Sequence, residues 1–294
     1  MRATRFPRLV VSSWLACLAG CAGSPFSSKT EDEVRLMVPV PICLQRLPRP
    51  TAGSIVALSP AEYWSMLLPS FDSGASTVDL AKPDCSRRLT LAEGAAGAGA
   101  VTIRVDQMVL GAGSDGFKIV WLPVRSFDTK RSGLLALLRQ RKDFLEVYAL
   151  GIHQGIEGTV RFALERMGTS LVVTALEERC SGEGDERLCD AASTVYLMHS
   201  GQLQVQARFP VDHTVKAKAT AATGSTEYRF SASADYRATG IVITEQLSVR
   251  EKGRGEVRSV DLERILRLQD GRLVASTESL WVQTAQQLGV PEDL

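Results

Sequence analysis

Alternation of apolar and polar residues, repeated between short turn signals, is the feature that most restricts how this chain can fold. In residues 227–236 every second side chain is apolar or aromatic: Tyr228, Phe230, Ala232, Ala234 and Tyr236. Neighbouring side chains of a strand point to opposite faces, so a period of two predicts a strand with one buried face. After a turn at Thr239-Gly240, the same apolar face is extended by Ile241, Ile243, Leu247 and Val249.

From residue 101 onward the pattern recurs on either side of short turns. The expected strand pairs are 101–110 with 117–124, 160–164 with 171–176, 195–198 with 203–209, and 260–268 with 273–276. Asp270-Gly271 joins the last pair and is the strongest short hairpin signal. Such turns indicate antiparallel pairing, and about ten strands are too many for one flat sheet. The sequence therefore predicts a mainly β fold, with an antiparallel, strongly curved sheet, barrel or sandwich and two or three short helices.

Three segments carry helix signals. Ser59-Pro60-Ala61-Glu62 is a capping box with proline at the first helical position, and it predicts a short helix through about Leu68. Residues 132–140 contain a cluster of four leucines: Leu134, Leu135, Leu137 and Leu138. Residues 279–288 place apolar side chains along one side and are followed by Gly289 as a C-cap. We expect the last two helices to lie over the apolar face of the sheet.

The first hundred residues differ in composition from the rest. Residues 22–33 are polar, turn-forming and charged, which is typical of a flexible tether. The next segment, 34–44, is apolar, but Pro39 and Pro41 restrict it to an edge strand or an extended segment. We therefore divide the chain into a signal segment, 1–20, a tether, 21–33, a mixed N-terminal segment, 34–100, and an antiparallel β domain, 101–294.

The N-terminus has the organisation of an export signal. Arg2, Arg5 and Arg8 precede a short apolar core over residues 9–18, which is too short to span a bilayer. Leu18-Ala19-Gly20-Cys21 follows, and it resembles the lipobox of bacterial lipoproteins, L-[AS]-[GA]-C. The alternative is an ordinary secretory signal in which Cys21 is incidental.

The resemblance to a lipobox implies an address and an anchor. Cys21 becomes the mature N-terminus and is linked to diacylglycerol, usually with a further acyl chain such as palmitate on its amine. Two or more acyl chains anchor a protein stably, whereas one does not. Ala22, where an Asp would favour retention at the inner membrane, implies the periplasmic face of the outer membrane.

Four cysteines remain after Cys17 leaves with the signal and Cys21 takes lipid. An even number in an oxidising compartment predicts two disulfides, with three possible connectivities. We choose Cys180–Cys189, which would close a polar loop, and Cys43–Cys85. A metal site is disfavoured because the chain has no C-x-x-C pair.

Charge argues against a nucleic-acid-binding protein. The signal holds three of the 34 basic residues and none of the 33 acidic ones, so the mature chain is close to neutral. A nucleic-acid binder would show a basic stripe and a high isoelectric point. The clusters 130–131 and 139–142 are basic and could lie on an anionic membrane, but we prefer core packing of the leucines between them.

Glycine motifs offer weak signs of catalysis. Gly111–Gly116 fits G-x-G-x-x-G, and Ser114 lies in an A-x-S-x-G variant of the nucleophile elbow. Both motifs require a helix after the loop, whereas residues 117–121 predict a strand. The glycines therefore indicate a hairpin turn.

Histidines and carboxylates are equally uninformative about chemistry. His199 and His213 are expected in surface loops, and His153, between Gly151 and Gly155, is the least ordinary histidine. A glycine-flanked imidazole could act as a base, but we prefer a structural role. Acidic pairs such as Glu177-Glu178 are expected on the solvated surface.

These patterns predict a lipid-anchored envelope lipoprotein that binds rather than catalyses. The expected partner is a hydrophobic small molecule or an envelope protein, beside the membrane reached through Cys21. If a pocket exists, its candidate lining residues are Tyr228, Phe230, Tyr236, Ile241 and Ile243, although plain core packing suits them better. A membrane-anchored hydrolase is the alternative, and the sequence assigns no metal, cofactor or nucleic acid to the protein.

Overall fold

The computed structural model describes residues 39–47, 57–89, 91, 99–127, 130–156, 159–181, 188–217, 226–251 and 257–290. These residues belong to one compact unit, Leu36–Leu294. The expected signal segment, Cys21 and the tether lie outside the described residues.

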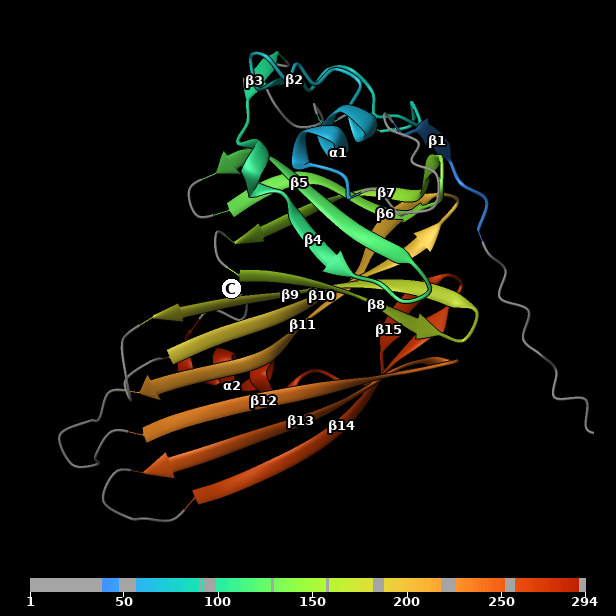
Figure 1. Cartoon of the computed structure of the whole chain (residues 1–294). Coiled ribbons are helices and arrows are strands. Elements are labelled where there is room, and N and C mark those ends of the chain that lie inside the picture. The colour runs from blue at the N-terminus through green and yellow to red at the C-terminus, as the bar shows by residue number, and fades with distance from the viewer. Residues whose placement is uncertain are drawn as a thin grey trace, which may run out of the picture. The chain divides into compact units, whose positions relative to one another are not determined.

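Strands make up most of this unit, so the expectation of a mainly β fold is confirmed (Figure 1). The strands are β1 (Cys43–Arg46), β2 (Thr77–Asp79), β3 (Ala100–Thr102), β4 (Val109–Ala112), β5 (Phe117–Phe127), β6 (Lys130–Gln140), β7 (Phe144–Ile156), β8 (Thr159–Met167), β9 (Ser170–Ser181), β10 (Leu188–His199), β11 (Gln202–Ala217), β12 (Thr226–Arg237), β13 (Gly240–Glu251), β14 (Val257–Gln269) and β15 (Arg272–Ala275). The helices are α1 (Pro60–Leu67), α2 (Leu280–Leu288) and a 3-10 turn, η1 (Val105–Gln107).

Among the described residues, thirteen strands form one sheet in the order β1-β7-β6-β5-β4-β8-β9-β10-β11-β12-β13-β14-β15. Neighbouring strands are antiparallel except for two parallel contacts of one residue pair each, Ala112 with Ala163 and Leu150 with Gln202. The sheet is therefore mixed rather than purely antiparallel, and it does not close into a barrel. Strands β2 and β3 form a separate small sheet.

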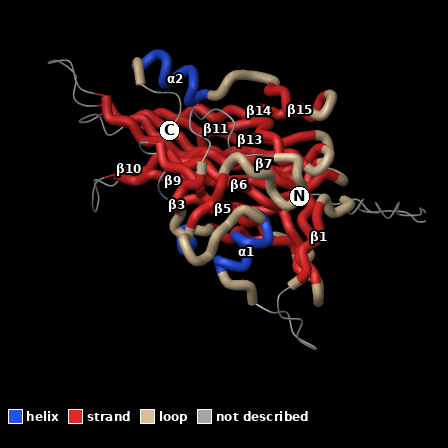
Figure 2. The backbone as a smooth tube through the Cα atoms, turned by 90° about the horizontal axis from the view of Figure 1, so that it is seen from above, coloured by secondary structure: helices blue, strands red, loops and turns tan. Residues whose placement is uncertain are grey.

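Both terminal helix predictions are confirmed. In α1 the Ser59 backbone N–H donates to Glu62 Oε2 at 2.7 Å, and the Glu62 backbone N–H donates to Ser59 Oγ at 3.4 Å. Ser59 thereby completes the capping box. α2 ends at Gly289, whose φ of 65° is the left-handed conformation that glycine adopts readily. Seen from above, the two helices lie on opposite sides of the strands (Figure 2).

The expected helix over residues 132–140 is wrong, because this segment is β6. All four leucines are fully buried, but they divide between two hydrophobic cores on opposite faces of the strand. Leu134 and Leu138 pack with α1, whereas Leu135 and Leu137 pack with side chains of β8 and β9. A strand buried on both faces is apolar at every position, and a short run of that kind has no period that separates it from a helix.

The hairpin turns fall where glycine signals predicted them. Asp115 and Gly116 have φ values of 55° and 78° in the turn from β4 to β5, and Gly271 has 76° in the turn from β14 to β15. The expected single strand over residues 101–110 is wrong in detail. It is divided into the end of β3, the η1 turn and the start of β4.

Candidate functional site

His153 lies at the centre of a buried polar cluster contributed by four strands. Its ring, on β7, is 0% exposed, and Nδ1 is 2.6 Å from the hydroxyl oxygen of Tyr196 on β10. Its Nε2 is 3.9 Å from Oε1 of Glu177 on β9, and the other carboxylate oxygen accepts from Arg208 on β11 at 3.4 Å. Gly155 makes room for the ring, since a Cβ there would lie 2.7 Å from Nε2.

Burial sets the protonation of this cluster. Loss of hydration lowers the pKa of His153 to about 3, and the positive charge of Arg208 acts in the same direction. Burial also raises the pKa of Tyr196, and the Glu177 carboxylate adds to that rise. A neutral Tyr196 hydroxyl can donate to or accept from Nδ1, according to the imidazole tautomer, and Nε2 faces Glu177. The imidazole is neutral and has no exposed surface from which to meet a substrate.

Two expectations about charged surface residues are wrong here. Glu177 was expected on the solvated surface, but it is 2% exposed inside β9. His213 was expected in a loop, but it lies in β11 and is 4% exposed. Its ring stacks on that of Trp281 with 4.4 Å between centroids, and its Nδ1 is 3.0 Å from Asp190 Oδ1. His199 is exposed, as expected, but it is the last residue of β10 rather than part of a loop.

Ser114 lies in the exposed turn between β4 and β5, so the glycine motif precedes a strand instead of a helix. Its neighbour Asp115 forms an ion pair with Arg166. This is the hairpin geometry that the sequence indicated, and it does not raise a serine above a helix N-terminus as a nucleophile elbow requires.

The candidate pocket-lining side chains are packed in cores. Phe230 is 1% exposed and contacts Trp281 of α2, with ring centroids 6.0 Å apart. Ile241 and Ile243 are fully buried in a cluster that half-buried Tyr236 also joins. Tyr228 is half-buried beside this region, opposite Val249.

A buried ion pair fixes α2 to the sheet. Glu245 on β13 is 0% exposed and accepts from Nε of Arg264 on β14, which is 6% exposed. The second carboxylate oxygen accepts from the backbone N–H of Leu280 at 2.8 Å. An anionic side chain at a helix N-terminus is favourable, so Glu245 both neutralises Arg264 and caps α2.

The first half of β14 is an open sheet edge. β14 pairs with β13 from Val257 to Arg267 without a register shift. On its other side, β15 pairs only with Leu266–Gln269. Just beyond this pairing, the Ser276 backbone N–H donates to the Ile265 carbonyl, and the Ile265 N–H donates to Ser276 Oγ. In the described part of the chain, no strand pairs with the outer side of residues 257–264. Val257 and Val260 on this edge are 50% and 55% exposed.

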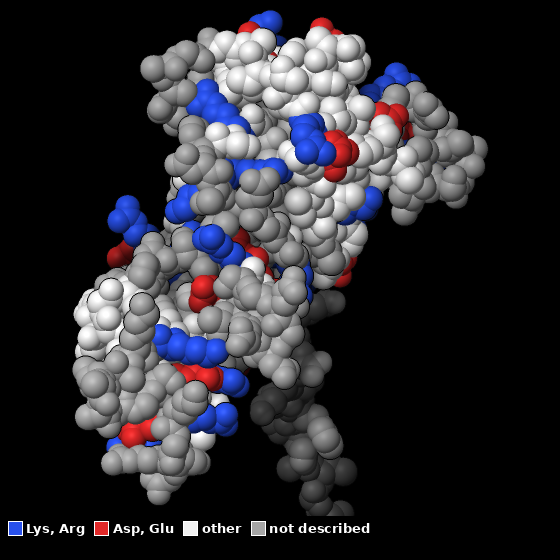
Figure 3. Space-filling model, turned by 90° about the vertical axis from the view of Figure 1, so that its left-hand side faces the viewer, with Lys and Arg blue, Asp and Glu red and all other residues white. Residues whose placement is uncertain are grey.

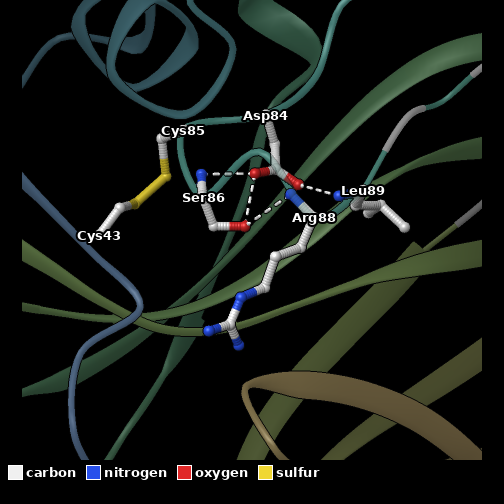
Figure 4. The surroundings of a disulfide bond; sticks show 6 residues. All are labelled: Cys43, Asp84, Cys85, Ser86, Arg88 and Leu89. Carbon is white, nitrogen blue, oxygen red and sulfur yellow. Dashed lines mark hydrogen bonds between the residues drawn. A yellow bond between two sulfur atoms is a disulfide. The ribbon is translucent and has the colours of Figure 1, made fainter.

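The other end of the sheet carries the disulfide Cys43–Cys85, as the sequence predicted (Figure 4). Buried Asp84 holds the adjoining turn by accepting from the backbone N–H groups of Ser86 and Leu89. Arg88 leaves this turn and donates to the Ser200 carbonyl at 3.0 Å. A hollow of about 480 Å³ lies between residues 39–42, Arg88, Tyr148 and the β10–β11 turn.

The second predicted disulfide, Cys180–Cys189, joins residues that face each other across β9 and β10. The polar loop that it closes lies outside the described residues. Basic and acidic side chains are interspersed on the face seen in Figure 3, as the neutral composition indicated.

Neither end of the sheet was predicted as a site. The strand expected over 260–268 omitted Val257, and no local pattern tells which strands end a sheet. No protein-family model matches the chain, and neither a curated protein nor a solved structure matches it significantly. Within the residues described, neither helix is long and apolar enough to cross a bilayer.

Proposed function

We propose that the mature protein is a lipid-anchored envelope lipoprotein that binds an envelope protein partner through the open edge of β14. The observation that carries this proposal is the outer side of residues 257–264, where a regular strand leaves its backbone groups without a neighbouring strand among the described residues. Such a row of N–H and C=O groups is a template for a further strand.

The edge is suited to pairing because it is regular. Proteins commonly block the pairing of an edge strand with a proline or a β-bulge. Residues 257–264 contain no proline, and their pairing with β13 has no bulge. Val260 is paired with Leu247 of β13, and Leu262 with Glu245. Paired residues point to the same face of a sheet, and Leu247 packs against the α2 cluster, so Val260 and Leu262 point to the face that α2 covers. The partner is therefore an extended segment with alternating apolar and polar side chains, whose apolar side chains continue this face.

The cores and the buried histidine favour this function over the alternatives. Hydrophobic cargo would need space among residues such as Phe230 and Ile243, which are packed against α2 and neighbouring strands. A hydrolase would need His153 to reach a substrate, but the ring is 0% exposed. Acylation of Cys21 would hold the protein at the periplasmic face of the outer membrane, where the partner is expected.

The test is photo-crosslinking in cells of the host bacterium. A benzophenone amino acid at Ser259, on the edge, should form an adduct with one envelope protein. The matched control at Ser233, in the middle of β12, should not. Equal adducts from both positions would contradict the proposal.

A proline scan separates strand pairing from simple proximity. Of two neighbouring residues in an edge strand, one directs its N–H outward. Ser259→Pro and Val260→Pro should therefore differ, one weakening the β13 ladder and the other leaving the unfolding transition nearly unchanged. The variant that stays stable should lose the adduct formed from a benzophenone at Asp261. Persistence of the adduct would rule out pairing at this edge.

A further inference from the structure

The β1 end of the sheet carries exposed apolar and basic side chains on one face. Leu44 and Arg46 of β1 alternate with less exposed neighbours, and Arg46 lies directly opposite Phe144 of β7. Leu44 is 58% and Phe144 44% exposed, and Val40, just before β1, is 84% exposed. Arg141 and Lys142 are exposed in the β6–β7 turn beside Phe144. We call these six residues the β1 face.

Among the described residues, basic side chains outnumber acidic ones on this face and its turn. Glu146, which pairs with Leu44 and so points the same way, is engaged by Arg141 at 3.2 Å and by the Tyr148 hydroxyl at 2.6 Å. Asp143 is half-buried at the turn. Arg139, opposite Glu146, lies over the Phe117 ring at 5.5 Å and adds a further positive charge.

The β1 face also adjoins Pro39, the described residue nearest to Cys21 in the sequence. Only the seventeen residues 22–38 separate Cys21 from Pro39. Fully extended, such a segment spans at most about 60 Å, so an acyl anchor on Cys21 would keep Pro39 within that distance of a bilayer. Val40 follows Pro39 directly, which makes the β1 face the described surface closest along the chain to the anchor.

We infer that the β1 face docks on the anionic phospholipid surface to which Cys21 is anchored. Val40, Leu44 and Phe144 would enter the boundary between headgroups and acyl chains, while Arg46, Arg141 and Lys142 meet the headgroups. Exposed apolar side chains flanked by Lys and Arg are the combination that holds peripheral proteins at such a surface. The nearness of this face to a bilayer depends on the proposed acylation of Cys21, whereas its charge and exposure do not.

The experiment places a fluorophore on the face of the protein purified from membranes. The native tryptophans of the mature chain, Trp64, Trp121 and Trp281, are at most 3% exposed, so an added tryptophan reports its own surroundings. Phe144→Trp probes the β1 face. Val274→Trp, on β15 at the other end of the sheet order, is the matched control because Val274 is also exposed, at 47%.

Both variants are mixed with vesicles of phosphatidylethanolamine, phosphatidylglycerol and a brominated lipid. We expect bromine to quench the added indole of Phe144→Trp at least twice as strongly as that of Val274→Trp, and high salt to weaken the difference. Each basic residue near an anionic surface strengthens binding about fivefold. Arg46→Glu with Lys142→Glu should therefore remove most of the quenching at position 144, whereas Arg258→Glu with Arg272→Glu should not.

Equal quenching at both positions, or none at position 144, would overturn the inference. A cross-link from position 144 to a protein in cells, without quenching on vesicles, would overturn it in favour of a protein partner. The mass of the N-terminal peptide reports acylation separately. If Cys21 carries no lipid, sedimentation of the same variants with vesicles still tests the face, so failure of the anchor and failure of the face are distinguishable.

Discussion

His153 illustrates how a residue typical of catalysis can serve the core. Its neighbours provide one hydrogen bond and one nearby carboxylate, and the rings of Trp121 and Phe162 pack edge-on against it at 4.9 and 5.2 Å. A buried polar network of this kind stabilises the fold only while its members keep the protonation states that match their partners.

The low pKa of His153 predicts a stability that falls in acid. The folded protein keeps this imidazole neutral down to a pH of about 3, whereas the unfolded chain protonates it below about 6.5. Because the unfolded state then binds more protons, stability is lost as the pH falls through this window, by up to about 1.4 kcal/mol per pH unit. Between pH 6.5 and 5, wild type should lose about 1.7 kcal/mol more than His153→Gln in chemical denaturation.

The matched control for this prediction is His199→Gln, which changes an exposed histidine. It should leave the pH dependence of the unfolding free energy as in wild type. Parallel pH profiles for wild type and His153→Gln would show that the buried imidazole is not the group responsible.

The pair Glu245–Arg264 predicts an asymmetric response to mutation. Arg264→Met leaves a buried carboxylate uncompensated, and such changes cost about 3–5 kcal/mol. The double variant Glu245→Leu with Arg264→Met removes both charges and should cost much less. It still loses the acceptor for the Leu280 N–H, which is worth about 1 kcal/mol. Urea denaturation measures both, and a double variant as unstable as the single one would contradict this explanation.

Among the elements, β6 could not be identified as a strand from its own residues. Leu134 and Leu135 are neighbours in the chain, yet one packs under α1 and the other faces β8 and β9. The residues that cover the two faces of β6 lie outside 132–140, in α1 and in β8 and β9. Burial on both faces therefore could not be predicted from this segment alone.

The two-sided burial of β6 is testable by truncating neighbouring leucines. Leu134→Ala and Leu135→Ala should each lower the unfolding free energy by about 2–5 kcal/mol, because each leaves a cavity in a different core. An amphipathic surface helix would tolerate one of two adjacent truncations. Chemical or thermal denaturation of both variants measures these losses. The control is Lys142→Ala at an exposed position, which should change the unfolding free energy little.

Strands with one wet face were predictable because their own sequence carries the period. β12 alternates between exposed and less exposed residues from Arg229 to Arg237, as its sequence indicates, and its turn into β13 begins after Arg237. The buried positions of His213 and Glu177 were not predictable. His213 is buried by Trp281, which lies far along the chain in α2, and Glu177 by contacts with other strands.

At the scale of the molecule, the sheet order separates the two proposed contacts. β1 begins the order and β14 and β15 end it, and Figure 1 places β1 and β14 at opposite ends of the described unit. A membrane contact at the β1 face would therefore leave the open edge of β14 accessible to a partner. The pairing order, which no single strand encodes, produces this division.

The two disulfides should differ in their contribution to stability. Cys43–Cys85 closes a loop with a sequence separation of 42 and joins β1 to the turn held by Asp84. Cys180–Cys189 has a separation of 9 and joins residues that β9 and β10 already pair. Restricting the unfolded chain is worth about 4 kcal/mol for the longer loop and about 2.6 kcal/mol for the shorter one.

Replacing each pair by alanines should therefore destabilise the protein unequally. We expect Cys43→Ala with Cys85→Ala to cost at least about 1.4 kcal/mol more than Cys180→Ala with Cys189→Ala, measured by chemical denaturation of proteins exported to an oxidising compartment. The larger loss also includes contacts, because half-buried Cys43 and Cys85 pack against the α1 core. A larger loss from the Cys180–Cys189 pair would mean that the β9–β10 hairpin depends on its cross-link rather than on strand pairing.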